Sequence, residues 1–354
     1  MNQIESFLHQ LLSAPGVAGF EGPVCEIIRK RWEPLTDEIH ISRVGSLHAL
    51  RRSSIPGKRP SLMIAAHMDA IGLMVKDIRD GLIWITSMGG VDPRILPGQL
   101  VTIHGAREYT GVVQMLPDRL VKHQPAGSAP GYSQLFVDTG LSANEIQANI
   151  HIGDVISFAS APTTLGDKYL SGHSLDNRAS VAALTVCLEE IKDYRLQWDL
   201  WAVATVQEEV RTVGAHTSTF ELKPDVGIAV DVTFAQEPGL STYETFPLGK
   251  GVTIGSGGNI HPALHRELKD RAEEIDLPYS IETMPKGSGT DAMAMQISSA
   301  GVPTLVIGIP LRYMHTPYEM VALKDIHRAG RLLARFITTL TSGSLESLFK
   351  GGAA

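Results

Sequence analysis

Apolar residues recur along the first segment of the chain at the spacing of an amphipathic helix. Positions i, i+3, i+4, i+7 and i+8 form one face of a 3.6-residue period, and here they are Ile4, Phe7, Leu8, Leu11 and Leu12. After a glycine-containing turn at residues 16–22, a weaker pattern predicts a second helix over Val24–Trp32. The short apolar run Ser61–Ala66 then predicts a buried strand that leads to His67.

The pattern changes between Leu73 and Lys168. Short β-rich runs recur there between Gly, Pro and Asp residues: GLIWITSM, GQLVTIHG, YTGVVQML, SQLFVDTG and GDVISFAS. Ser142 and Glu145 have the spacing of a capping box, which predicts one short helix among these strands. Closely spaced strands with little helix favour a small barrel or sandwich. We therefore expect an inserted all-β domain, of the barrel or PDZ-like kind, over residues 73–168.

Beyond Lys168 the chain alternates between helical and strand patterns. The predicted helices are Asn177–Ile191, Pro262–Ile275 and Leu323–Leu340, and the predicted strands are Asp199–Val206, Val226–Val230 and Thr304–Ile309. Such alternation predicts an α/β fold, with a largely parallel central sheet in a three-layer α/β/α domain. This domain would comprise residues 1–72 and 169–354. The GGAA end is expected to be disordered.

Composition narrows the classes of protein to consider. The 354 residues are 43% hydrophobic and 19% charged, which excludes a disordered or fibrous chain. The net charge of −7 provides no basic surface, so we expect no nucleic-acid partner and no membrane partner. Cys25 and Cys187 are too few for a disulfide framework. Neither a signal peptide nor an apolar run of about 20 residues is present, which predicts a cytoplasmic protein.

Chemically capable residues collect at the ends of the predicted strands. Ligands of open α/β sheets bind at the carboxyl ends of the strands. Asp176 precedes a predicted helix, and the other members of the set follow predicted strands. Two histidines and five carboxylates are thus expected on one rim: His67, Asp69, Asp176, Glu208, Glu209, Asp231 and His315.

Each of these residues also has an ordinary structural interpretation. Asp176 alone would be a helix N-cap, and the other eleven histidines are expected to be simply hydrogen-bonded. Several carboxylates facing one another would repel, however, and a divalent cation relieves that repulsion. Imidazole with carboxylate suits Zn²⁺ or a similar ion. The set exceeds the needs of one catalytic zinc, so two ions sharing a bridging carboxylate fit better, with one glutamate left as general base.

The ordered set AAHMDAIG, SLDNRAS, VQEEVRTVGA, VDVT, GTDA and IPLRYMHTPYEMV resembles the dinuclear metallo-aminopeptidases of the glutamyl aminopeptidase and tetrahedral (TET) aminopeptidase family. The resemblance covers essentially the whole chain. It implies that His67 and Asp231 bind one metal, that Glu209 and His315 bind the other, and that Asp176 bridges them. It also implies that Asp69 orients His67 and that Glu208 is the general base.

The same resemblance implies removal of the N-terminal residue from peptides, with two divalent ions per subunit, Zn²⁺ or alternatively Co²⁺ or Mn²⁺. The inserted β-domain would help to build a homo-oligomer, which in this family is often a tetrahedral dodecamer. The chain departs from the family pattern at Ala70, at Arg211 and at Gln114–Pro117. These departures affect the expected substrate preference and assembly contacts, and none removes a proposed ligand.

The sequence leaves two alternative functions open, a glycoside hydrolase of the endoglucanase type and a catalytically silent shell or scaffold protein. Some relatives carry an endoglucanase label, but Glu208 and Glu209 are adjacent, whereas glycosidase carboxylates face each other across a sugar. A catalytically silent shell protein would lack a ligand or the base, and none is missing here. We interpret Gly287-Ser288-Gly289 and Gly255–Gly258 as ordinary loops near the substrate cleft, because neither completes a nucleophile elbow or a phosphate loop.

Overall fold

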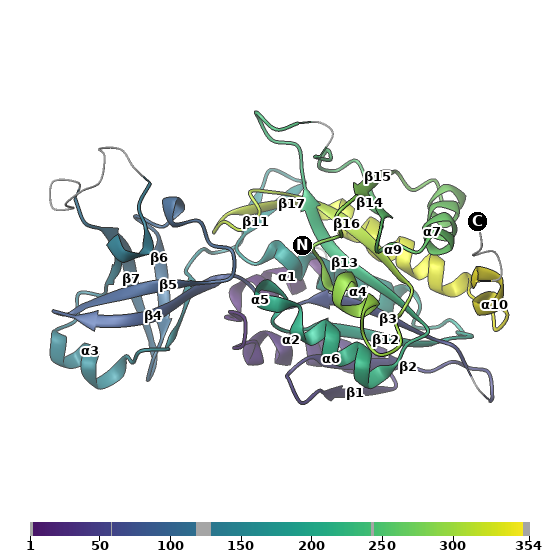
Figure 1. The fold of residues 1–354 in the computed structure, drawn as a ribbon, viewed down its shortest axis with the longest axis horizontal. Coiled ribbons are helices and arrows are strands. Elements are labelled where there is room, and N and C mark those ends of the chain that lie inside the picture. Colours follow the sequence, from purple (N-terminus) through teal and green to yellow (C-terminus); the bar gives the residue numbers. More distant parts are fainter. Residues whose placement is uncertain (1–2, 58, 118–128, 242–243, 350–354) are drawn as a thin grey trace.

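The computed structural model describes residues 3–57, 59–117, 129–241 and 244–349 (Figure 1). The GGAA end, for which we expect disorder, lies outside these residues. Figure 1 shows a large α/β body, with a small β-structure projecting from one side of it. Within the described residues, no helix has the length and apolar character needed to cross a membrane.

The α/β body is built on an 11-stranded mixed sheet, in the order β1-β2-β12-β3-β13-β16-β17-β11-β10 with β14 and β15 attached beside β16. Its centre, β12-β3-β13-β16, is parallel, and β2 and β17 flank this centre in antiparallel pairs. The strands are β1 (Glu38–Ile41), β2 (Leu47–Arg51), β3 (Ser61–His67), β10 (Thr163–Leu165), β11 (Tyr169–Gly172), β12 (Asp199–Thr205), β13 (Val226–Phe234), β14 (Val252–Gly257), β15 (Tyr279–Met284), β16 (Thr304–Arg312) and β17 (Glu319–Ala322).

Helices cover both faces of this sheet. α4 packs against α1, α9 and the strands β3 and β13, whereas α6 and α8 pack together against β12 and β13. The helices are α1 (Gln3–Ser13), α2 (Gly22–Trp32), α3 (Ala143–Asn149), α4 (Leu175–Glu190), α5 (Glu208–Arg211), α6 (Val213–Leu222), α7 (Pro262–Glu274), α8 (Asp291–Gln296), α9 (Leu323–Thr339) and α10 (Ser344–Phe349). The expected α/β/α architecture with a parallel centre is confirmed.

The projecting β-structure is a closed antiparallel barrel in the order β4-β5-β8-β7-β6-β9. Its strands are β4 (Gly72–Arg79), β5 (Leu82–Met88), β6 (Leu100–His104), β7 (Glu108–Met115), β8 (Leu135–Asp138) and β9 (Val155–Phe158). Alternate residues of these strands point inward and form a separate apolar core. The capping box of Ser142 with Glu145 begins α3, as predicted. β10, by contrast, pairs with β11 in the larger sheet.

Two expectations from the sequence need correction. Gly255, Ser256 and Gly257 are not a loop but the last part of β14, which pairs in parallel with β15. The strand predicted to end at Val230 continues to Phe234, because β16 pairs with it along this whole length. Asp231 therefore lies inside β13 and not beyond its end.

A fully buried arginine of α4 ties the end of α1 to the segment that follows β3. The Arg178 guanidinium donates from Nε to the carbonyl of Met68 (3.2 Å) and from Nη1 to the carbonyls of Leu11 and Ala14 at the end of α1. Burial lowers the pKa of Arg178 to about 10, so the group stays charged at neutral pH. A Cβ atom at Gly16 would lie 2.4 Å from Nη2, so this close approach requires glycine.

Replacing this arginine is expected to destabilise the fold strongly. Arg178→Met preserves much of the side-chain length but leaves buried carbonyls without donors and buried carboxylates without a counter-charge. We expect the free energy of unfolding to fall by about 3–5 kcal/mol. Chemical denaturation followed by circular dichroism measures this loss.

The matched control is Arg335→Met. Arg335 pairs with Glu274 at the surface, where both side chains are more than one-third exposed. Its loss should cost less than about 1 kcal/mol, because solvent screens exposed ion pairs. Equal losses in the two variants would contradict the structural role assigned to Arg178.

Candidate metal centre

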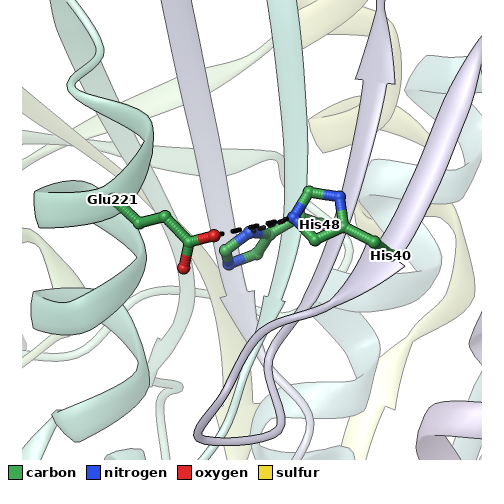
Figure 2. Close-up of side chains that lie close together, drawn as sticks. All are labelled: His40, His48 and Glu221. Atoms are coloured by element: carbon green, nitrogen blue, oxygen red, sulfur yellow. Dashed lines mark hydrogen bonds and ion pairs between the residues drawn. The ribbon is translucent and has the colours of Figure 1, made fainter.

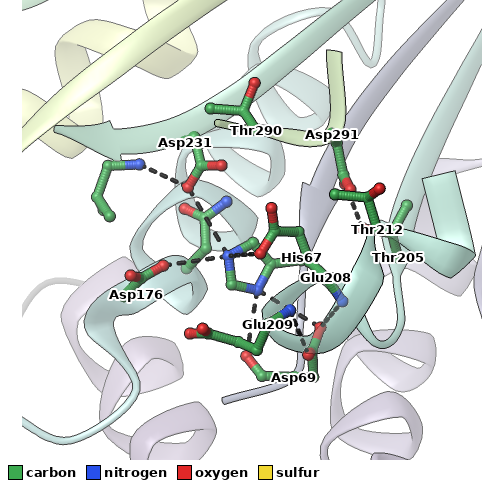
Figure 3. A network of polar contacts seen from close by, with 12 residues as sticks. His67, Asp69, Asp176, Thr205, Glu208, Glu209, Thr212, Asp231, Thr290 and Asp291 are labelled. Atoms are coloured by element: carbon green, nitrogen blue, oxygen red, sulfur yellow. Dashed lines mark hydrogen bonds and ion pairs between the residues drawn. The ribbon is translucent and has the colours of Figure 1, made fainter. Parts of the chain in front are cut away.

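The residues predicted to share a rim come together at the carboxyl edge of the parallel strands, and Figure 3 labels all of them except His315. His67 is the last residue of β3, and α5 begins with Glu208 and Glu209 shortly after β12 ends. Asp231 is part of β13, but β13 pairs with β3 only as far as Ala229. Its side chain therefore lies past the paired region, close to His67.

Asp176 lies between two imidazoles. His67 Nε2 is 3.1 Å from Asp176 Oδ1, and His315 Nε2 is 3.3 Å from Asp176 Oδ2. Asp176 and Asn177 lack helical backbone angles, so the regular part of α4 begins only after them. Each oxygen of one carboxylate thus faces a different histidine, which is the arrangement needed to bridge two cations.

The remaining members of the rim surround these three groups at slightly longer distances. Glu209 Oε2 lies 3.4 Å from His315 Nε2. Asp231 Oδ1 and Glu208 Oε2 lie 3.8 Å and 3.9 Å from His67 Nε2. Among the described residues, His67, Asp176 and Glu209 also offer ligand atoms that all lie within 4.8 Å of one another.

Asp69 organises this rim through the backbone. Its Oδ1 accepts the amide of Glu208 at 3.0 Å, and its Oδ2 accepts the amide of Glu209 at 3.1 Å. The first turn of α5 is thereby fixed in place. His67 Nδ1 lies 3.2 Å from the Asp69 carbonyl oxygen and 3.5 Å from its carboxylate, which leaves Nε2 directed toward the other side chains.

Glu319 is a functional candidate that the sequence interpretation missed. Its Oε2 accepts the amide of Asp176 and its Oε1 accepts the amide of His315, both at 3.0 Å. One buried carboxylate therefore aligns the two chain segments that carry Asp176 and His315. The sequence signal was a glutamate within the motif HTPYEMV, but only the folded chain places its side chain beneath both segments.

Two further features of the rim come from residues to which the sequence analysis gave no role. The buried Asp291 accepts a hydrogen bond from Thr205 at 2.5 Å, at the end of β12. At Gly90, which follows the barrel strand β5, a Cβ atom would lie 2.7 Å from His315 Nδ1. The chain leaving the barrel thus packs directly against a candidate ligand, and this contact requires glycine.

Burial and mutual repulsion strongly affect the protonation of the rim. Burial raises the pKa of Glu208 to about 8, and it raises the pKa values of Glu209 and Asp231 well above the usual carboxyl range. Burial also favours the neutral form of Asp176, but hydrogen bonds with His315 and His67 lower its pKa below the ordinary value. The positive charge within the rim is therefore too small to balance all of its carboxylates in their ionised form.

The donor set fits a pair of borderline divalent cations. Two imidazole nitrogens and several carboxylate oxygens face one another, and Glu209 Oε1 is buried without a hydrogen-bond partner within the described chain. An uncompensated buried carboxylate oxygen is costly, and a metal ion would satisfy it. Imidazole and carboxylate ligands together suit Zn²⁺, Co²⁺ or Mn²⁺ better than Ca²⁺.

Known proteins resemble this chain over almost its full length. It is 32% identical over 339 residues to the lysyl aminopeptidase of Pyrococcus furiosus, covering 94% of this chain and 96% of that one. The crystal structure of a TET aminopeptidase from a marine sediment Thaumarchaeota archaeon superimposes with a TM-score of 0.92 at 26% identity, covering 98% and 99% of the two chains.

A second solved structure that resembles this chain is that of a peptidase that assembles into shells. The Pyrococcus horikoshii TET1 peptidase, described as able to form a tetrahedron or a large octahedral shell, gives a TM-score of 0.83 at 25% identity, covering 96% and 100% of the two chains. Residues 45–332 match the family model described as M42 glutamyl aminopeptidase. This chain therefore belongs to the M42 glutamyl aminopeptidase family.

Proposed function

We propose that this protein is an aminopeptidase that hydrolyses the N-terminal residue of peptides at a centre of two divalent metal ions. The observation that carries the proposal is the position of Asp176, whose two oxygens lie 3.1 Å and 3.3 Å from the imidazoles of His67 and His315. Membership of the M42 family supports the aminopeptidase activity.

In this proposal the ligands divide between the two ions. His67 and Asp231 would bind one ion, Glu209 and His315 would bind the other, and Asp176 would bridge them. Zn²⁺ is the expected metal, with Co²⁺ and Mn²⁺ as alternatives that suit the same ligands. When bound, the ions would polarise the scissile carbonyl and lower the pKa of a coordinated water toward about 7.

Glu208 is proposed as the general base. Its carboxylate lies 3.9 Å from His67 Nε2, outside the closest contacts of the rim, so it is free to face a water there. The side chain is 12% exposed, so solvent can reach it. Two cations bound beside it would favour the ionised form of Glu208, which would then take a proton from the attacking water and deliver it to the leaving amine. Asp69, which holds the Glu208 amide, would fix the position of this base.

The competing functions fit the rim less well. A glycoside hydrolase needs two carboxylates on opposite sides of a sugar ring, about 5–9.5 Å apart. Here Asp69 fixes Glu208 and Glu209 on the same helical turn, and the carboxylates converge on imidazoles. A silent scaffold is disfavoured because every proposed ligand and the proposed base are present and buried or half-buried within this rim.

We further propose that the protein forms a homo-oligomer, with a tetrahedral dodecamer as one candidate assembly. The resemblance to the assembling TET1 peptidase supports this proposal. The barrel projects from the α/β body, so it is well placed to contact other subunits (Figure 1). It also exposes large apolar side chains, including Leu100 at 56% and Ile152 at 68%.

The first prediction concerns the free α-amine of the substrate. Peptides with a free N-terminus should release single N-terminal residues, whereas the same peptides with an acetylated N-terminus should react at least about tenfold more slowly. Removal of one terminal residue at a time requires recognition of that amine. Chromatography of the products over time, with and without a chelator, measures the release of single residues and the difference in rate between the two sets of peptides. Equal rates for free and acetylated peptides would contradict the proposal.

The second prediction separates the base from the ligands. Glu208→Gln should lower kcat by about 10²–10⁴-fold, the usual contribution of a general base, while the bound metal content stays unchanged. The variant is nearly isosteric, so the amide contact with Asp69 should persist. Steady-state kinetics and metal analysis of the same sample measure the two quantities.

His315→Ala is the comparison variant for this experiment. It should lose metal content as well as activity, because it removes a proposed ligand. Near-normal turnover in Glu208→Gln would exclude Glu208 as the base. Full metal content in His315→Ala would exclude His315 as a ligand.

A further inference from the structure

A second group of histidine and carboxylate side chains lies apart from the rim, at the β1–β2 edge of the sheet. It consists of His40 on β1, His48 on β2 and Glu221 near the end of α6 (Figure 2). The sequence interpretation treated both histidines as ordinary hydrogen-bonded residues. The fold brings them together with a carboxylate from a helix more than 170 residues away in the chain.

Strand register and helical spacing create this group. His40 and His48 are direct cross-strand partners in the antiparallel β1–β2 pair, so their side chains emerge side by side on one face of the sheet. On α6, Ser218 and Glu221 are three residues apart and therefore lie on the same side of the helix. Ser218 Oγ lies 2.8 Å from His48 Nε2, which places Glu221 above the histidine pair.

The distances match those between the ligands of one metal ion. His40 Nε2 lies 3.3 Å from His48 Nδ1, and it lies 3.8 Å from Glu221 Oε1. Each residue offers one ligand atom, and these atoms all lie within 4.8 Å of one another. Two nitrogens bound to tetrahedral zinc at about 2.0–2.1 Å are themselves roughly 3.3 Å apart, which is the observed separation of the imidazoles.

His48 is held in the orientation of a ligand. It is fully buried, and its Nε2 contacts Ser218, so Nδ1 is the atom that faces His40 and Glu221. A hydrogen bond to the far ring nitrogen is the usual support of a metal-bound histidine. Burial, together with His40, lowers the pKa of His48 to about 4, so at neutral pH the ring is in its neutral, metal-binding form.

We propose that His40, His48 and Glu221 form a separate binding site for a borderline divalent cation of the Zn²⁺ class. The side chains of His40 and Glu221 are 45% and 50% exposed, so solvent would complete the coordination. The bound ion would join the sheet edge to the end of α6. This helix starts directly after α5, which carries Glu208 and Glu209, so the site would brace the element next to the rim.

The decisive experiment compares zinc content. Wild-type protein and His40→Ala are equilibrated in the same Zn²⁺-buffered solution, and the zinc bound per chain is measured. We expect the variant to bind one ion fewer. The two proteins have the same rim, so the difference in their zinc content does not depend on how many ions the rim binds. The matched control is His151→Ala, which removes an exposed histidine next to the barrel strand β9 and should leave the content unchanged.

Trp201 on β12 supplies an independent signal. Its ring centroid lies 6.1 Å from that of His40 and 6.4 Å from that of His48. Cu²⁺, which binds such ligands more tightly than Zn²⁺, should quench the Trp201 emission with about one equivalent beyond those that the rim binds. The part of the emission lost in Trp201→Phe identifies the contribution of Trp201. In His40→Ala and Glu221→Gln, the Cu²⁺ concentration needed for half of this quenching should rise at least about tenfold.

Equal zinc content in wild type and His40→Ala would overturn the proposal, as would unchanged quenching of Trp201 in that variant. The two imidazoles would then be a hydrogen-bonded pair only. His40 and Glu221 are chosen because they are exposed, so their replacement should leave the fold intact, whereas His48 is part of the core. Aminopeptidase activity is not the readout, so failure of the proposed function leaves this test valid.

Discussion

Repulsion between carboxylates buried at one edge of a parallel sheet is the constraint on which this structure depends. Asp69, Asp176, Asp231, Asp291 and Glu319 are all at most 6% exposed, and only one of the described arginines, Arg178, is fully buried near them. In a region of low dielectric constant such a set raises its own pKa values or takes up cations. Cations bound as proposed for this rim would offset that repulsion.

Backbone amides provide part of the compensation and also set the geometry. Asp69 accepts the amides of Glu208 and Glu209, and Glu319 accepts those of Asp176 and His315. Asp69 therefore ties the segment after β3 to the first turn of α5, and Glu319 joins the two segments that carry Asp176 and His315. The proposed metal ligands are held by this network before any ion binds, which lowers the cost of organising the site.

The sequence predicted most of the fold where burial follows the chain's own periodicity. The helices α1 and α9 and the strands β3, β12 and β16 were predicted because their apolar residues are spaced for a helix face or a fully buried strand. The edge strand β1 was not predicted, because nearly all of its residues are exposed and its pairing depends on β2. The extension of β13 to Phe234 likewise depends on its neighbour β16.

The sequence alone determined the parallel centre of the sheet, a small inserted β-domain and which residue types lie at the rim, because hydrophobic period and residue type are local properties. Only the tertiary structure placed Glu319 under Asp176 and His315, and only the tertiary structure set His40 and His48 beside Glu221. These contacts join segments that are remote in the chain. Register and helix packing decide them, and neither is encoded within any single segment.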